Sequence, residues 1–181
     1  MSCFTAKIPP DLPLLAIDLG YSATQASCGI ATLEAVNESL KFGEAIAWTA
    51  AHLNQNGPHI LIIEAVLSTY HRSDGNPNIR GSFEKGRGWY HGPGVSTFAA
   101  AQRFLSELEL ALSITDTIPL IEGFLSYKTT KTSHADDAYR LITEFRTAEC
   151  FTPCEGSQAI LPSIDHPPEI RRYNPPPSSE T

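Results

Sequence analysis

The sequence predicts an α/β fold, and two observations support this expectation. Short apolar runs of strand length alternate along the chain with segments whose apolar residues recur every three or four positions, as on one face of a helix. The chain has 181 residues, 41% of them apolar and 18% charged, which is enough for one domain with a sizeable core. We expect this domain to span residues 1–150. Residues 151–181 hold seven of the fourteen prolines and lack periodicity, so they are predicted to form a wrapping or disordered tail.

The first half of the chain predicts paired strands, a helix and a further strand. Apolar or small residues fill 14–18 and about 23–32, and the intervening Gly20-Tyr21-Ser22 suggests a hairpin-like pair. A third, shorter strand is expected over 33–40. Helical spacing follows at Phe42, Ala45, Ile46, Thr49 and Leu53, and the polar segment 54–58, with its glycine and proline, ends this helix. The run 59–63 is again typical of a strand.

The second half begins with an irregular segment. Residues 68–94 show no apolar periodicity and are rich in glycine, which predicts a long loop inserted into the domain. A helix is expected next, with its apolar face at Phe98, Ala101, Leu105, Leu108 and Leu112. Residues 118–121 are strand-like. Ser133-His134-Ala135-Asp136 has capping-box spacing and predicts a helix whose apolar face is Ala138, Leu141, Ile142 and Phe145.

Acidic residues stand where the predicted strands end. Asp18, Glu64 and Glu122 each follow an apolar run, and Asp137 lies on the helix face that also carries Leu141. Carboxylates forced together repel one another, and a hard divalent cation relieves this repulsion by accepting their oxygens as ligands. The pattern therefore predicts a Mg2+ or Mn2+ site. Such a site can activate water for the hydrolysis of a phosphodiester bond.

Each acid also has a simpler interpretation. An acidic residue at a strand end often caps a helix or faces water, and Asp136 is expected to serve the capping box. His134 is a candidate proton carrier or partner of the acids, although a polar residue in a capping turn needs no further role. The order of the acids along the chain favours the metal site.

Three segments carry a resemblance to a known family. AIDLGYSATQASCGIA, IIEAVLS and SHADDAYRLI resemble the acidic motifs of the RNase H-like superfamily, which includes the Holliday-junction resolvases. Within it, IEAVLS, GNPNIRGSFEKGRGWYHGPG and EGFLSYK are similar to a group of uncharacterised predicted nucleases. Over residues 14–148 the resemblance implies a mixed five-stranded sheet flanked by helices, with Asp18, Glu64 and Asp137 as catalytic metal ligands. Glu122 joins them on its spacing alone.

The inserted loop is the most basic part of an acidic chain. It carries a net charge of +2, against −7 for the whole sequence, and aromatic residues lie among its cations. Arginine beside aromatic rings suits the stacking of bases and the binding of phosphate. The alternative is a solvated loop whose aromatic residues fold back on the core. The candidate substrate-binding residues are Arg72, Arg80, Lys85, Arg87, Trp89 and His91.

The sequence thus predicts a metal-dependent nuclease with nucleic acid as its partner. The net charge of −7 keeps two alternatives open: a non-catalytic binding protein of the same fold, and a hydrolase of a small phosphoester. A P-loop enzyme is not supported, because G-x-x-x-x-G-K-[ST] is absent. An actin-like ATPase would need two such domains.

The remaining features concern the cellular setting. No apolar stretch reaches the length of a membrane span, and the first residues lack the apolar core of a signal peptide, so we expect a cytoplasmic protein without membrane contact. The four cysteines, Cys3, Cys28, Cys150 and Cys154, are expected to be free thiols, because the C-x3-C pair has no second pair of metal ligands nearby.

Overall fold

The computed structural model describes residues 4–5, 11–34, 39–67, 74–77, 79, 86–123, 125 and 131–147. The predicted tail over 151–181 lies outside these residues, as do residues 68–73, 78 and 80–85 of the predicted loop over 68–94. Within the described residues, strands and helices alternate along the chain, so the predicted α/β class is confirmed. No helix among them is both long and apolar enough to cross a membrane.

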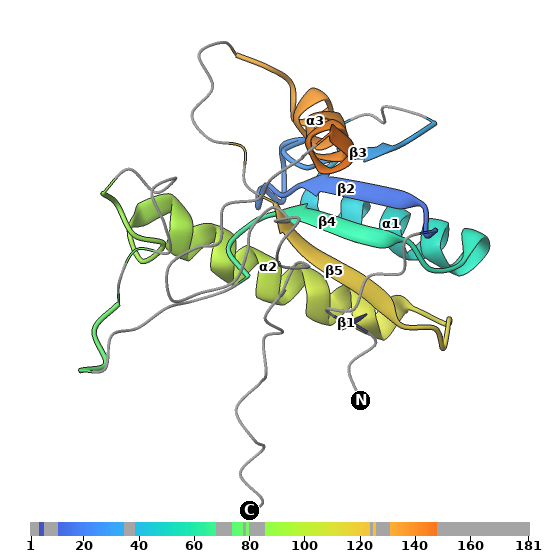
Figure 1. Ribbon diagram of the computed structural model, residues 1–181, viewed down its shortest axis with the longest axis horizontal. Coiled ribbons are helices and arrows are strands. Elements are labelled where there is room, and N and C mark those ends of the chain that lie inside the picture. The colour runs from blue at the N-terminus through green and yellow to red at the C-terminus, as the bar shows by residue number, and fades with distance from the viewer. Residues whose placement is uncertain are drawn as a thin grey trace, which may run out of the picture.

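The sheet is mixed and open. Its four longer strands are β2 (Leu14–Asp18), β3 (Gly29–Thr32), β4 (Ile60–Glu64) and β5 (Ile118–Gly123), and the two-residue β1 (Phe4–Thr5) extends it at the edge of β5. The strand order is β1-β5-β4-β2-β3 (Figure 1). Only the pair β2–β3 is antiparallel, so β2, β4 and β5 all point their carboxyl ends toward the same side.

Helices cover both faces of this sheet (Figure 1). The helix α3 (His134–Thr147) packs across β3, β2 and β4 on one face. On the other face lie α1 (Phe42–Asn56) and α2 (Gly92–Ala111), which contact each other through an edge-on pair of rings, Phe42 and Phe104. Nearly every residue of β2, β4 and β5 is buried, because these strands are enclosed between the two helical layers.

The second half of the predicted hairpin is shorter than expected. Residues 23–27 are not a strand, because Ser22 and Ser27 side chains capture backbone groups there: Ser22 N–H donates to Ser27 Oγ (3.1 Å), and Gln25 N–H donates to Ser22 Oγ (2.9 Å). Such local bonds compete with strand pairing. The third strand expected over 33–40 is also wrong for its described residues, of which only Leu40 pairs, in a single bridge to Cys28.

The helix predictions are confirmed with shifted ends. The last residue of the first helix is Asn56, and the residue that caps it is Gly57, whose positive φ of 83° is a conformation that favours glycine. The second begins at Gly92, with Pro93 in its first turn, so the loop before it ends earlier than predicted. The third begins at the predicted capping box. Of its predicted apolar face, Ala138, Leu141 and Ile142 are buried, and Phe145 is partly buried against the same core.

Candidate carboxylate site

Two carboxylates meet because their strands are parallel neighbours. Asp18 at the end of β2 is in register with Glu64 at the end of β4, so both side chains lie on the same face of the sheet. Gly123 of β5 is in register with Glu64, and a Cβ added there would come within 2.8 Å of Leu141 of α3. Both acids therefore lie on the face that α3 covers. Asp18 is only 9% exposed.

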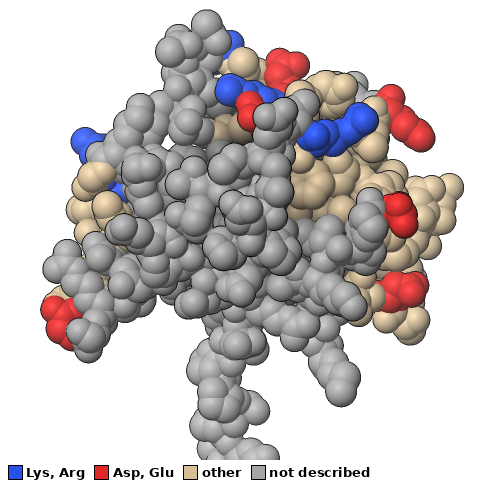
Figure 2. Space-filling view, in the orientation of Figure 1, with Lys and Arg blue, Asp and Glu red and all other residues tan. Residues whose placement is uncertain are grey.

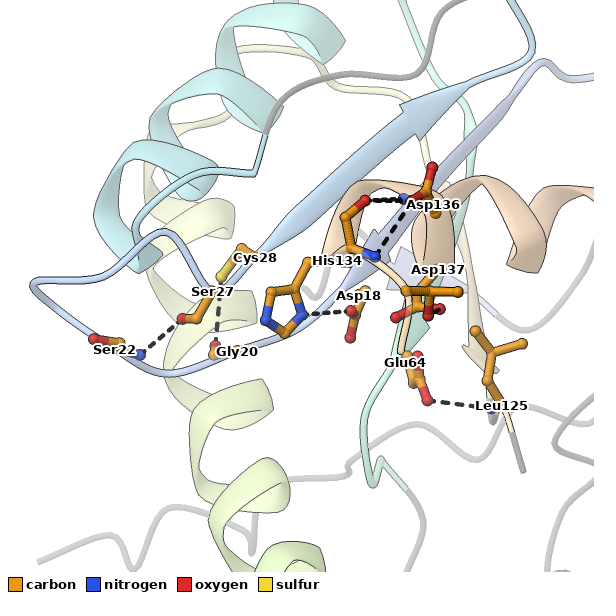
Figure 3. Close-up of polar contacts among 12 residues, drawn as sticks. Asp18, Gly20, Ser22, Ser27, Cys28, Glu64, Leu125, His134, Asp136 and Asp137 are labelled. Carbon is orange, nitrogen blue, oxygen red and sulfur yellow. Dashed lines mark hydrogen bonds and ion pairs between the residues drawn. The ribbon is translucent and has the colours of Figure 1, made fainter. Parts of the chain in front are cut away.

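The third acid comes from the helix that covers this face. Asp137, in the first turn of α3, is 2% exposed, and Thr132 Oγ1 donates a hydrogen bond to its Oδ1 (2.7 Å). Figure 3 shows the side chains of Asp18, Glu64 and Asp137 gathered where the ends of β2 and β4 meet the start of α3. The three predicted metal ligands thus converge from three elements that are distant in sequence.

His134 lies directly against this group. Its Nδ1 is 2.7 Å from Asp18 Oδ2, and its side chain is 48% exposed, so it stands between the buried acid and solvent (Figure 3). The close approach depends on Gly29, the register partner of Asp18, because a Cβ at Gly29 would overlap the backbone carbonyl of His134. The absence of a side chain there lets the first turn of α3 rest on the sheet.

Asp136 takes the capping role that the sequence predicts for it. It is exposed, its carboxylate accepts hydrogen bonds from the Ser133 hydroxyl (2.6 Å) and the Ser133 N–H (3.3 Å), and its own N–H donates to Ser133 Oγ (3.1 Å). These bonds lower the pKa of Asp136. Adjacent aspartates in one helical turn therefore have separate roles, one in the cap and one inside the molecule.

Glu122 does not join the other acids, which corrects its assignment by spacing. It lies inside β5 rather than after it, and it is in register with Ile63, one residue before Glu64. Because successive side chains alternate between faces, Glu122 points away from α3 and toward the opposite face. It is 2% exposed there.

The three convergent acids fit a hard cation in chemistry but are engaged with protein partners. Asp18 contacts His134, Asp137 accepts from Thr132, and Glu64 Oε1 accepts from the backbone N–H of Leu125 (3.2 Å). Among the residues that the structure describes, no three His, Cys, Asp or Glu side chains are close enough to hold a metal ion. Carboxylate oxygens are nonetheless the ligands that Mg2+ and Mn2+ prefer. Binding of an ion would therefore require at least one carboxylate to exchange its partner.

The candidate substrate-binding residues are only partly described. Arg72, Arg80 and Lys85 lie outside the described residues. Arg87 and His91 are exposed, and His91 occupies the N-cap position of α2 without a capping hydrogen bond from its side chain. Trp89 is half-buried, with its ring 6.0 Å from that of Phe98 in α2, as the fold-back alternative expects. In Figure 2 the coloured cationic and anionic side chains intermingle on this face.

Two neighbours of the site escaped the sequence analysis. Cys28 is buried and donates its S–H to the Gly20 carbonyl (3.5 Å). Burial raises its pKa to about 11, and the charge of Asp18 adds to this rise. Thr132, the partner of Asp137, lies before the cap. The glycine that follows Cys28 was the one available signal, since a glycine inside a strand often marks a close approach.

Comparisons of this chain with protein-family models, with curated proteins and with solved structures found no match.

Proposed function

We propose that this chain is a divalent-metal-dependent nuclease of the RNase H-like type, in which Asp18, Glu64 and Asp137 hold Mg2+ or Mn2+. The observation that carries the proposal is the convergence of these carboxylates from β2, β4 and α3. Their order, a strand aspartate, a later strand glutamate and an aspartate on a late helix, is the one that the family resemblance implies. The mixed sheet with helices on both faces agrees with it.

The free-energy cost of burying charged carboxylates favours a bound cation at this position. Asp18 and Asp137 are almost wholly shielded from water, where a charged carboxylate is unfavourable unless it is paired. A protein that needed only packing there would be better served by apolar residues. A bound divalent ion would stabilise all three carboxylates and would supply an activated water for attack on phosphorus.

The other residues of the site act around those ligands. His134 holds Asp18 through Nδ1, which leaves Nε2 as the atom that can carry a proton to or from the substrate. Arg87, exposed in the loop before α2, would bind backbone phosphate together with Arg72, Arg80 and Lys85 of the same loop. Nucleic acid is the substrate class that such a basic, aromatic segment favours.

The test is cleavage of single-stranded, double-stranded and branched DNA and RNA in Mn2+ or Mg2+, with Asp137→Asn set beside Asp136→Asn. The two positions are adjacent, but only Asp137 is buried among the acids. We expect Asp137→Asn and Asp18→Asn to abolish cleavage, and Asp136→Asn to retain it. Equal activity of the Asp136 and Asp137 variants would overturn the proposal.

A second candidate rests on the net charge. A net charge of −7 is opposite in sign to the basic surface that long nucleic acids favour, which suits a small phosphoester substrate or a binding protein without catalysis. Replacing Arg80 and Arg87 by alanine separates these classes. For a nuclease we expect weaker binding of nucleic acid and a flatter dependence on salt, whereas hydrolysis of a small aryl phosphodiester that is insensitive to both changes would favour the second candidate.

A further inference from the structure

Two adjacent hydroxyls before α3 bind two adjacent aspartates. Thr132 Oγ1 donates to Asp137 Oδ1 (2.7 Å), and Ser133 Oγ donates to Asp136 Oδ2 (2.6 Å). The second pair belongs to the exposed capping box, which stabilises the helix. The first pair reaches an acid that is only 2% exposed and that lies among the carboxylates of the site (Figure 3). The hydroxyl of Thr132 therefore has a task other than capping.

The helix fixes the backbone of Asp137 but leaves the rotation of its carboxylate open. The Asp137 N–H donates to the Ser133 carbonyl (3.1 Å), and this bond sets where the side chain leaves the first turn of α3. The last torsion of an aspartate side chain has a broad energy profile without sharply preferred rotamers. The rotamer alone therefore orients the two carboxylate oxygens poorly, whereas a hydrogen bond to one of them fixes that rotation.

The hydroxyl of Thr132 is well suited to hold this carboxylate for a cation. A separation of 2.7 Å is typical of an O–H donor bound to a charged acceptor. Threonine is branched at Cβ and stiff about χ1, so its hydroxyl is held more firmly than that of a serine. The donor is neutral, so the negative charge of Asp137 is kept. A carboxylate also has about four acceptor sites, of which this bond uses one.

We propose that Thr132 is a positioning residue of the carboxylate site, which presents Asp137 to the divalent ion in the orientation that binding requires. This inference rests on the proposed function, because it assigns a task within that site. Carboxylates that bind metal are commonly held by hydrogen bonds from other residues, and removal of such a partner typically costs about 10- to 100-fold in metal affinity or activity. Thr132 acts through Asp137 alone. The exchange of partners that an ion requires then falls to Asp18 or Glu64.

The experiment compares two variants of the full-length chain. Thr132→Val keeps the shape of the side chain and removes the hydroxyl, whereas Thr132→Ser keeps the hydroxyl. Cleavage of nucleic acid is measured over a range of Mn2+ concentrations, and the rise in Tm that Mn2+ produces is measured beside it. In Thr132→Val we expect the half-saturating Mn2+ concentration for cleavage to increase about 10- to 100-fold. The rise in Tm at a given Mn2+ concentration should be smaller than in the parent.

The dependence on Mn2+ concentration identifies a residue that acts through the ion. The loss of rate in Thr132→Val should shrink as Mn2+ is raised, because a weakened site still fills at high concentration. Thr132→Ser should restore most of the affinity of the parent, since its hydroxyl can donate the same bond to Asp137. A purely structural role of Thr132 would instead lower Tm in the absence of ions and would leave the Mn2+ dependence of cleavage unchanged.

Two controls match the change at Thr132. Ser133→Ala removes the adjacent hydroxyl, whose partner Asp136 lies outside the site, so it should lower stability without changing the half-saturating Mn2+ concentration. Thr97→Val makes the same substitution in α2, where the Thr97 hydroxyl donates to the Pro93 carbonyl (2.9 Å), and it should respond to Mn2+ like the parent.

The outcomes distinguish this inference from the proposed function. If the parent cleaves and Asp137→Asn does not, a Thr132→Val variant with the Mn2+ dependence of the parent would overturn the positioning role and leave the nuclease proposal standing. A loss of activity that no Mn2+ concentration reduces and that Thr132→Ser does not rescue would also overturn the positioning role, because the defect would not act through the ion. A parent that neither cleaves nor responds to Mn2+ would overturn both proposals.

Discussion

Gly29 is the residue on which the assembly of the carboxylate site most depends. Its missing side chain lets the backbone of His134 lie against β3, and this contact holds the imidazole beside Asp18. A methyl group at this position would overlap backbone atoms of His134 and Ala135. Unlike a side chain, these backbone atoms cannot move away by a change of rotamer.

We therefore expect Gly29→Ala to lower the free energy of unfolding by about 1–3 kcal/mol, the range typical of overpacking. The measurement is urea unfolding. The control is Gly43→Ala, at an exposed position in α1 with open space around it, which should leave stability unchanged or raise it because alanine favours helix. Equal losses in both variants would argue against a specific contact with α3.

Cys28 gives a residue-level prediction of pH dependence. Its pKa is raised from 9.0 to about 11 because the buried thiolate would be poorly solvated. The thiol should therefore resist iodoacetamide at pH 8 in the native protein and react in urea, which peptide mapping by mass spectrometry can follow. Because the pKa is higher in the folded protein than in the unfolded chain, the protonated thiol stabilises the fold. This stabilisation is complete below pH 9 and is lost as the pH rises toward 11. Rapid native labelling at Cys28 would contradict the burial.

At the scale of elements, the capping box fixes where α3 begins. Ser133 and Asp136 exchange hydrogen bonds across the first turn, and the following residue, Asp137, is then turned into the molecule. The start of the helix thus decides which of two adjacent aspartates reaches the site.

Ser133→Ala should lower the free energy of unfolding by about 1 kcal/mol at neutral pH, as losses of such caps do. The pKa of Asp136 is lowered from 3.8 by its bonds from Ser133, so the stabilisation is present above pH 3.8 and is lost as the pH falls through the lowered value. The difference between variant and parent should therefore shrink in acid. Urea unfolding at about pH 6 and about pH 2.5 measures it. A difference that stays constant would exclude the carboxylate from the cap.

The elements also show how far the sequence could be interpreted. Periodicity identified α1, α2, α3, β2, β4 and β5, because burial of one helix face or of a whole strand leaves a pattern in the residues. Residues 23–27 were mistaken for strand because two serine hydroxyls bind backbone N–H groups in this segment, which no periodicity reveals. Glu122 was misplaced because its face depends on register with β4, and register arises only when distant strands pair.

The same distinction applies to the candidate site. Asp18, Glu64 and Asp137 could be selected because each follows a pattern within a few residues of itself. The partners Thr132 and Cys28, and the contact of Gly29 with α3, arise only from packing between elements.

At the scale of the whole molecule, the proposed metal site predicts that stability responds to divalent ions. A ligand that binds only the folded state stabilises it by mass action, by about 2.7 kcal/mol at 100 times its Kd. We expect Tm to rise with millimolar Mg2+ or Mn2+, measured against NaCl of equal ionic strength. The rise should disappear in Asp137→Asn and persist in Asp136→Asn. A Tm that neither Mg2+ nor Mn2+ changes would contradict a metal site formed by these carboxylates.

The central position of β4 has a consequence for the order of folding. Only β2 and β3 are close in sequence; β4 pairs with β2 across the whole of α1, and β5 joins β4 only after the loop and α2 have been made. Closing such long loops costs conformational entropy before the strand contacts that compensate for it have formed, so topologies of this kind fold slowly. During synthesis on the ribosome the apolar strand β4 must therefore wait for β5 with one edge unpaired. That interval is when the chain is most exposed to aggregation and most dependent on chaperones.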